Sequence, residues 1–192
     1  MDKTIELLRK SDALLEGHFI LSSGKHSNRY IQCAKLIEHP TYCQEVAEII
    51  AEKVKEAGID VDLCVGPAMG GIIIAYEVAR ALGTNAIFTE RENNIMTLRR
   101  GFEIKEGSKV LIVEDVITTG KSSFETVEVI KEHGGEVVGL SSIVNRSGKE
   151  EINGVKLISA VNIHVEAWDP DDIPEELAGI PAVKPGSRKM KS

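Results

Sequence analysis

The strongest constraint on the fold lies in residues 110–122, where the chain changes character abruptly. The apolar run VLIV is followed directly by two acidic residues, Glu114 and Asp115, and then by the polar stretch TTGKS at 118–122. The apolar run indicates a buried strand, and the periodic residues 122–133 predict a helix that Gly134 ends. A strand, a turn and a helix in this order form a βα unit, which belongs in a parallel sheet covered by helices.

The same alternation recurs on both sides of this segment. Further short apolar strands are predicted at residues 63–65, 86–88 and 137–144. Further helices are predicted at residues 2–10, 41–57 and 71–82. We therefore predict an α/β fold with a central parallel sheet flanked by helices, and we expect ligands beyond the carboxyl ends of its strands.

The charge balance excludes a protein whose surface attracts anions through an extended positive electrostatic potential. Lys and Arg number 23 against 30 Asp and Glu, a net charge of -7, so we expect no nucleic-acid partner. The odd, widely spaced cysteines Cys33, Cys43 and Cys64 favour a reducing cytoplasm over a disulfide framework. No stretch predicts an export leader or a membrane span. Any anionic ligand must therefore be held locally.

The residue types at 114–122 suit a sugar phosphate. The hydroxyls of Thr118, Thr119 and Ser122, with the free amides of the helix's first turn, can hold a phosphate dianion. The carboxylates of Glu114 and Asp115 can accept hydrogen bonds from a vicinal diol. A phosphate at one end and a diol at the other indicate a ribose 5-phosphate.

Two other interpretations of this segment compete. Ser122 and Glu125 fit a capping box, which would make part of the pattern a plain helix start. The stretch also imitates the P-loop of nucleotide hydrolases, but Asp115 stands where that loop needs its first glycine. Because a carboxylate there would repel a polyphosphate, we disfavour the P-loop.

A second loop, GPAMGG at residues 66–71, also follows a predicted strand and precedes a helix. Its small residues let the backbone approach a ligand closely, so its amides could contact a pyrophosphate. The alternative is a tight connection that binds nothing.

Residues 110–122 resemble the phosphoribosyl pyrophosphate (PRPP) signature of the type I phosphoribosyltransferases. The resemblance implies that the acidic pair lies against the ribose hydroxyls and that residues 118–122 hold the 5-phosphate. The PRPP-binding residues that it implies are Glu114, Asp115, Val116, Ile117, Thr118, Thr119, Gly120, Lys121 and Ser122. It also implies a pyrophosphate contact at Ala68, Met69 and Gly70, with a non-proline cis peptide between Ala68 and Met69.

Residues 14–30 resemble the N-terminal hood of the orotate-using members of that family, and residues 179–188 resemble the C-terminus of a subset of them. This resemblance implies that Thr118 and Arg146 bind orotate, since a guanidinium suits a planar carboxylate. Lys25 and Tyr30 are further candidates in the hood. By residue type alone these two fit an ordinary surface hairpin equally well.

The resemblance implies a mobile loop at residues 89–101, with Arg91 as the catalytic residue that reaches the neighbouring subunit's site. Arg99 and Arg100 are further candidates there. Many orotate-using members have a lysine in the pyrophosphate loop and a mobile loop rich in lysine and histidine, and this chain has neither. The alternative for residues 89–101 is a solvated charged hairpin.

The resemblance divides the chain into a hood at 1–40 that contributes to the base site, a PRPP-binding core at 41–165, and an extension at 166–192 that lies partly over the hood and frays at its end. It implies transfer of ribose 5-phosphate from PRPP to N1 of orotate in pyrimidine biosynthesis, with Mg²⁺ held mainly by substrate, in a cytoplasmic homodimer. Two alternatives stay open. A purine-type phosphoribosyltransferase would leave Arg146 without a carboxylate to bind, and a PRPP-sensing regulator would keep the fold without catalysis.

Overall fold

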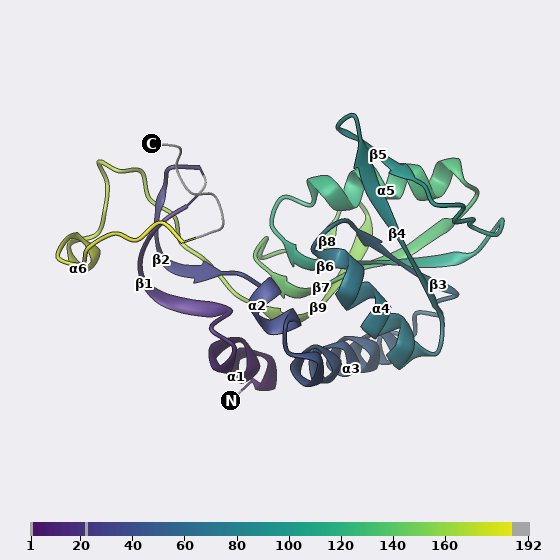
Figure 1. Ribbon diagram of the computed structural model, residues 1–192, viewed down its shortest axis with the longest axis horizontal. Coiled ribbons are helices and arrows are strands. Elements are labelled where there is room, and N and C mark those ends of the chain that lie inside the picture. The colour runs from purple at the N-terminus through teal and green to yellow at the C-terminus, as the bar shows by residue number, and fades with distance from the viewer. Residues whose placement is uncertain (1, 22, 186–192) are drawn as a thin grey trace.

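The computed structural model describes residues 2–21 and 23–185, and their main feature is a seven-stranded sheet with the order β5-β4-β3-β6-β7-β9-β8 (Figure 1). Its central strands run parallel and are β3 (Leu63–Pro67), β4 (Asn85–Glu92), β6 (Lys109–Ile117), β7 (Glu136–Asn145) and β9 (Val155–Asn162). The edge strands β5 (Ile95–Leu98) and β8 (Glu151–Ile152) are antiparallel to their neighbours. The parallel α/β architecture predicted from the sequence is confirmed.

Helices cover both faces of this sheet. Helices α3 (Pro40–Glu56) and α4 (Gly71–Leu82) lie on one face, and α5 (Lys121–Glu132) lies on the other (Figure 1). Because side chains alternate along a strand, β6 serves both layers. Leu111 and Val113 pack in the cluster of α3 and α4, whereas Ile112 packs in the cluster of α5. This burial fixes the strand, and therefore the acidic pair at its carboxyl end.

A smaller layer stands beside the core and joins the two ends of the chain (Figure 1). Strands β1 (Leu14–Ile20) and β2 (His26–Ile31) form an antiparallel pair. The C-terminal segment, which contains the short helix α6 (Glu175–Ala178), runs along both of its edges. Trp168 N donates to His26 O over 2.8 Å, and Val183 N donates to His18 O over 2.9 Å. The His18 ring Nδ1 also donates to the Ile180 carbonyl over 2.7 Å.

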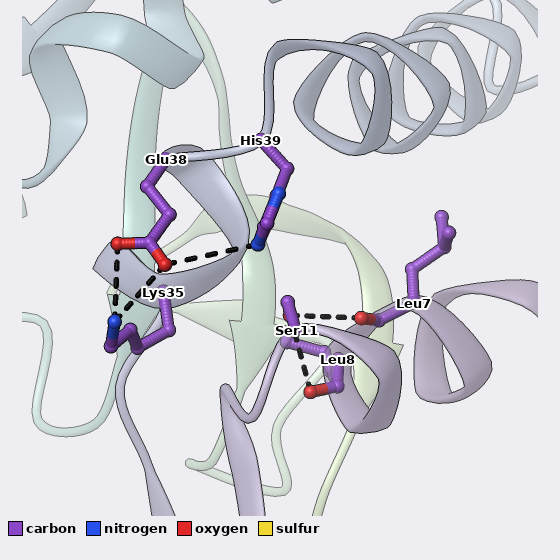
Figure 2. Close-up of polar contacts among 6 residues, drawn as sticks. All are labelled: Leu7, Leu8, Ser11, Lys35, Glu38 and His39. Atoms are coloured by element: carbon purple, nitrogen blue, oxygen red, sulfur yellow. Dashed lines mark hydrogen bonds and ion pairs between the residues drawn. The ribbon is translucent and has the colours of Figure 1, made fainter.

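Two short helices connect this layer to the core, α1 (Lys3–Lys10) and α2 (Ala34–Ile37). Figure 2 shows how they end: the Ser11 hydroxyl donates to the carbonyl of Leu7 over 2.8 Å, and Glu38 lies between Lys35 and His39. Leu8 of α1 and Leu36 of α2 are buried in the same apolar cluster as α3 and α4. The hood is therefore anchored in the main core at its base.

The strands and helices predicted in the core are present, and most of their ends lie within two residues of the expected ones, though β4 and β6 run further. The sequence did not predict β8 and β9. The capping-box interpretation is wrong: Gly120 is the residue before α5, no side chain caps that helix, and Glu125 pairs with Arg91 instead. Among the described residues, no helix combines the length and the apolar character needed to cross a membrane.

Candidate functional site

The acidic pair lies at the carboxyl end of β6, as predicted. Glu114 is only 8% exposed, and it accepts a hydrogen bond of 3.3 Å from the Ser123 hydroxyl. Asp115 Oδ1 accepts one of 2.8 Å from the amide of Val116. Burial, with a smaller contribution from the negative charge of Asp115, raises the pKa of Glu114 to about 8, and burial also raises the pKa of Asp115. These desolvated carboxyl groups are suited to hydroxyl donors.

A small pocket follows the acidic pair at the start of α5. Gly120 holds it open with φ of 77°, a left-handed conformation that other residues adopt with strain. The pocket has a volume of about 80 Å³ and is lined by Glu114, Val116, Ile117, Thr118, Thr119, Gly120, Lys121, Ser122 and Ser123. A liquid water takes about 30 Å³, so the pocket suits a group the size of a phosphate. The first-turn amides of α5 supply donors for such an anion.

The second predicted loop, residues 66–71, lies directly beside the first. Its Ala68–Met69 peptide is cis, as expected, and Ala68 N donates to Thr89 O over 2.7 Å. A Cβ placed on Gly70 would lie 2.5 Å from the carboxyl carbon of Asp115. The backbone of this loop therefore touches the acidic pair, and the two loops form one continuous site at the carboxyl edge of the sheet.

Arg146 lies where β7 ends, beside the end of β6. Its amide donates to Ile117 O over 2.8 Å. Its side-chain Nε is buried and has no hydrogen-bond partner among the residues that the structure describes. Burial lowers the pKa of Arg146. A half-buried guanidinium with an unsatisfied donor is chemically suited to an anion, because an unpaired buried charge is costly.

Two residues of this site were missed by the sequence analysis. Ser123 follows directly after the motif, and its donation to Glu114 could have been suspected from that place. Cys33 directly precedes α2 and is buried. Burial raises the pKa of its thiol well above the usual value, the charge of Asp115 adds to this effect and that of Arg146 opposes it, so both groups lie near enough to act on the thiol electrostatically. No sequence pattern connects it to them.

The hood candidates are engaged within the hood and the C-terminal segment. Lys25 Nζ lies 3.2 Å from Asp169 Oδ1, in an exposed ion pair. The Tyr30 ring packs against Phe19 with 5.9 Å between the ring centroids. Asp169 itself begins a turn, since Asp172 N donates to Asp169 O over 2.9 Å.

Of the three arginines at residues 89–101, Arg91 belongs to the hairpin of β4 and β5, which lies beside α5 (Figure 1), and Arg99 and Arg100 directly follow β5. Arg91 forms an ion pair with Glu125 of α5. Arg99 Nη2 lies 3.2 Å from Glu92, and Arg100 Nε lies 3.0 Å from Glu90. The Arg100 guanidinium also lies 5.6 Å above the Phe88 ring. Each arginine is thus paired with an acid of its own chain.

A larger depression of about 420 Å³ lies at the opposite, amino edge of the sheet. It is lined by Asp62, Leu63, Asn85, Glu103, Lys105, Glu106, Gly107 and Ser108. None of the predicted site residues is among them.

Comparison with known proteins gives a consistent result. Residues 33–170 match the family model described as phosphoribosyl transferase domain. The chain is 49% identical, over 98% of both lengths, to the orotate phosphoribosyltransferase of Desulforamulus reducens. It resembles the crystal structure of the Aeropyrum pernix orotate phosphoribosyltransferase, with a TM-score of 0.68 and 27% identity over 82% of this chain and 92% of that one. It also resembles the Mycobacterium tuberculosis orotate phosphoribosyltransferase in complex with PRPP, with a TM-score of 0.65 and 26% identity over 83% and 95%.

Proposed function

The chain belongs to the phosphoribosyltransferase family and, within it, to the orotate phosphoribosyltransferases, and from this premise we propose how its residues act. The reaction transfers ribose 5-phosphate from PRPP to N1 of orotate, which gives orotidine 5′-monophosphate and pyrophosphate. It is a step of pyrimidine nucleotide biosynthesis. The assignment of roles below rests on one observation, the meeting of the acidic pair, both loops and Arg146 at the carboxyl edge of the sheet.

The donor occupies the two loops in sequence. Residues 118–122 and the first turn of α5 hold the 5-phosphate in the pocket of about 80 Å³. Glu114 and Asp115 accept hydrogen bonds from the ribose hydroxyls. The pyrophosphate lies over residues 66–71, whose exposed Met69 and Gly70 present backbone rather than a basic side chain. One donor molecule thus spans the whole carboxyl edge.

Arg146 receives the carboxylate of orotate. Its buried Nε has no partner among the described residues, and a carboxylate would satisfy it in a charge-assisted hydrogen bond. Thr118 directly follows β6 and lines the phosphate pocket, and we assign it to the border of the base as well. We assign the hood at 1–40 and the extension at 166–192 to the base side of the site, and residues 41–165 to the donor side.

The chemistry needs electrostatic placement more than proton transfer. Departure of pyrophosphate leaves positive charge on the ribose and gathers negative charge on the leaving group. The carboxylates next to the ribose stabilise the positive charge on the ribose. The loop amides, with nearby arginines, stabilise the negative charge on the pyrophosphate. Because orotate enters as an anion, no residue is assigned as a general base.

Mg²⁺ supplies charge neutralisation on the pyrophosphate when it is bound. The donor itself would hold most of this ion, because magnesium generally keeps few protein ligands and binds through substrate phosphates. Of the two acids, Asp115 fits better as a supporting ligand, because its Oδ2 is free of the hydrogen bond described above.

We also propose that two copies form a homodimer, with the catalytic Arg91 of one reaching the site of the other. An apolar stripe supports this proposal: Met69, Ile73 and Tyr76 are 85%, 53% and 64% exposed. They follow at helical spacing on the outer side of α4, and Met69 itself belongs to the pyrophosphate loop. A copy that covers this stripe stands beside the donor. The buried cysteines Cys33, Cys43 and Cys64, none paired, suit a cytoplasmic location.

The function is tested by the loss of orotate absorbance after addition of PRPP and Mg²⁺, with adenine, guanine and xanthine as competing bases. Arg146→Ala should raise the KM for orotate at least about tenfold and leave the KM for PRPP within about twofold, since one charge-assisted hydrogen bond is lost. Arg80→Ala, on the surface of α4, is the matched control. Turnover of a purine and not of orotate would overturn the assignment of orotate as the base. An unchanged KM for orotate in Arg146→Ala would show that Arg146 does not bind the base.

A further inference from the structure

The turn that follows β7 is folded around the side chain of Asn145. Asn145 is the last residue of β7 and is only 3% exposed. Its Oδ1 accepts hydrogen bonds of 2.8 Å from the amide of Ser147 and 2.7 Å from the Ser147 hydroxyl. Its Nδ2 donates to Lys149 O over 2.9 Å. A side-chain oxygen that accepts from the amide two residues later forms an Asx turn, and the residue enclosed by this one is Arg146.

The donors and acceptors of this turn are fully matched. The Ser147 amide can only donate and the Lys149 carbonyl can only accept, so the carboxamide oxygen of Asn145 must face Ser147 and its amino group must face Lys149. While the Ser147 hydroxyl donates to Asn145, its oxygen accepts a hydrogen bond of 3.2 Å from Lys149 N. No other uncharged side chain has both an acceptor and a donor on so short a stem, so the turn depends on asparagine.

The backbone is also held on both sides of Arg146. Before it, the carbonyl of Asn145 accepts a hydrogen bond of 2.9 Å from Ile163 N, just after β9. At Arg146 itself, the amide donates to Ile117 O over 2.8 Å, at the end of β6. After it, the Asx turn holds Ser147. The two neighbouring strands thus fix the start of the turn, and only the side chain of Asn145 fixes its exit.

The guanidinium of Arg146 depends on this backbone for its position. Its Nε is buried and has no hydrogen-bond partner within the part of the chain that the structure describes. An arginine side chain is long, so a small rotation of the backbone at its base moves the guanidinium by a larger distance. A misplacement of about 1 Å in a binding group can lower a reaction rate about a hundredfold.

We propose that Asn145 is a positioning residue for Arg146, which sets the guanidinium at the place where the carboxylate of the base binds. The proposal rests on the function proposed above and adds a residue that determines its specificity for the base. The effect is directed to the base and not to the donor, because Asn145, Ser147 and Lys149 are not among the residues that line the phosphate pocket.

The experiment measures the KM for orotate and for PRPP in Asn145→Ala, Asn145→Asp, Arg146→Ala and the double variant with Ala at both positions. Asn145→Ala should raise the KM for orotate about tenfold and leave that for PRPP within about twofold. Asn145→Asp keeps the acceptor for Ser147 and should stay within about threefold of the native KM for orotate. When Arg146 is already Ala, Asn145→Ala should change the KM for orotate by less than about twofold.

Asn162→Ala is the matched control, since Asn162 lies opposite Asn145 in the register of β9 with β7 and is exposed. It should keep both native KM values. An equal rise of both KM values in Asn145→Ala, a native KM for orotate, or an unchanged effect in the Arg146→Ala background would overturn the proposal. If Asn145→Ala does not fold, Ser147→Ala decides: a rise of about threefold for orotate alone supports the proposal, and any other result refutes it.

A second readout needs no substrate and separates this inference from the function. The exchange of the Arg146 Nε proton with water is measured by ¹⁵N NMR, with the signal assigned by its absence in Arg146→Ala. Asn145→Ala should speed this exchange at least about tenfold, and Asn145→Asp should restore most of the protection. A native protein that does not convert orotate refutes the function, and the exchange rate still decides the positioning role. A converting enzyme whose Asn145→Ala variant keeps the native exchange rate refutes the positioning role alone.

Discussion

At the scale of single residues, Glu114 shows how the fold prepares a carboxyl group for a neutral donor. It is buried at the end of β6 beside a second acid, and its described hydrogen-bond donor is the Ser123 hydroxyl, which carries no charge. Its pKa of about 8 means that the ligand-free protein at neutral pH holds Glu114 mostly protonated. Burial of this group costs stability, and such a cost is typical of active sites, which agrees with the role proposed for Glu114 as an acceptor for a sugar hydroxyl.

This raised pKa predicts a loss of stability with rising pH. Between the ordinary value of 4.5 and about 8, the folded state keeps a proton that the unfolded state releases. The contribution of Glu114 to the free energy of unfolding is therefore full at low pH and is lost as pH rises through this window, by a few kcal/mol at most. Glu114→Gln should flatten this part of the profile, measured by urea unfolding at several pH values across the window.

The matched control is Glu128→Gln, since Glu128 lies exposed on α5 and pairs with Lys131 over 3.3 Å. That change should leave the slope as it is, because exposed ion pairs contribute little. A Glu114→Gln profile as steep as the native one would show that another group titrates.

At the scale of elements, the sequence predicted the features that lie within one short segment and missed those that form between distant segments. The signals for β6, the turn after it and α5 lie within one short stretch, so the strand, the loop and the helix were all predicted. β9 follows the short strand β8 and pairs with β7. Its residue pattern was not recognised as that of a strand. The close approach of Gly70 to Asp115 arises only when separate βα units meet. No spacing in the chain encodes it.

A further prediction concerns Arg91, which lies in the β4–β5 hairpin. Arg91→Ala should lower kcat about a hundredfold, a typical loss when one cation that stabilises a leaving group is removed. The unfolding midpoint should change little, since a partly exposed ion pair such as that with Glu125 contributes about 1 kcal/mol. Steady-state kinetics and thermal unfolding measure the two effects.

Arg100→Ala, in the turn just after this hairpin, is the control. Its guanidinium pairs with Glu90 and lies over Phe88, so its loss should act on stability and leave kcat within about threefold. Mixing Arg91→Ala with Asp115→Ala subunits should restore about a quarter of native activity if Arg91 acts across a twofold dimer. No restoration would place Arg91 in the site of its own chain.

At the scale of the whole molecule, the apolar stripe of Met69, Ile73 and Tyr76 predicts the subunit interface. Tyr76→Glu puts a charge on this stripe and should convert a dimer into a monomer of about 20.9 kDa, because a charge left unpaired in an interface is costly. Sedimentation equilibrium measures the mass. Lys131→Glu, on α5 across the sheet, should keep the dimer, and a dimeric Tyr76→Glu variant would place the interface elsewhere.

The pairing of β1 with Val183 also has a consequence for synthesis. Because His18 and Ile20 exchange hydrogen bonds with a residue near the other end of the chain, the outer edge of the hood has no partner until the ribosome has made almost everything else. The donor side can fold earlier, since its strands and helices follow one another closely. A nascent chain should therefore acquire affinity for the sugar phosphate before it can enclose the base.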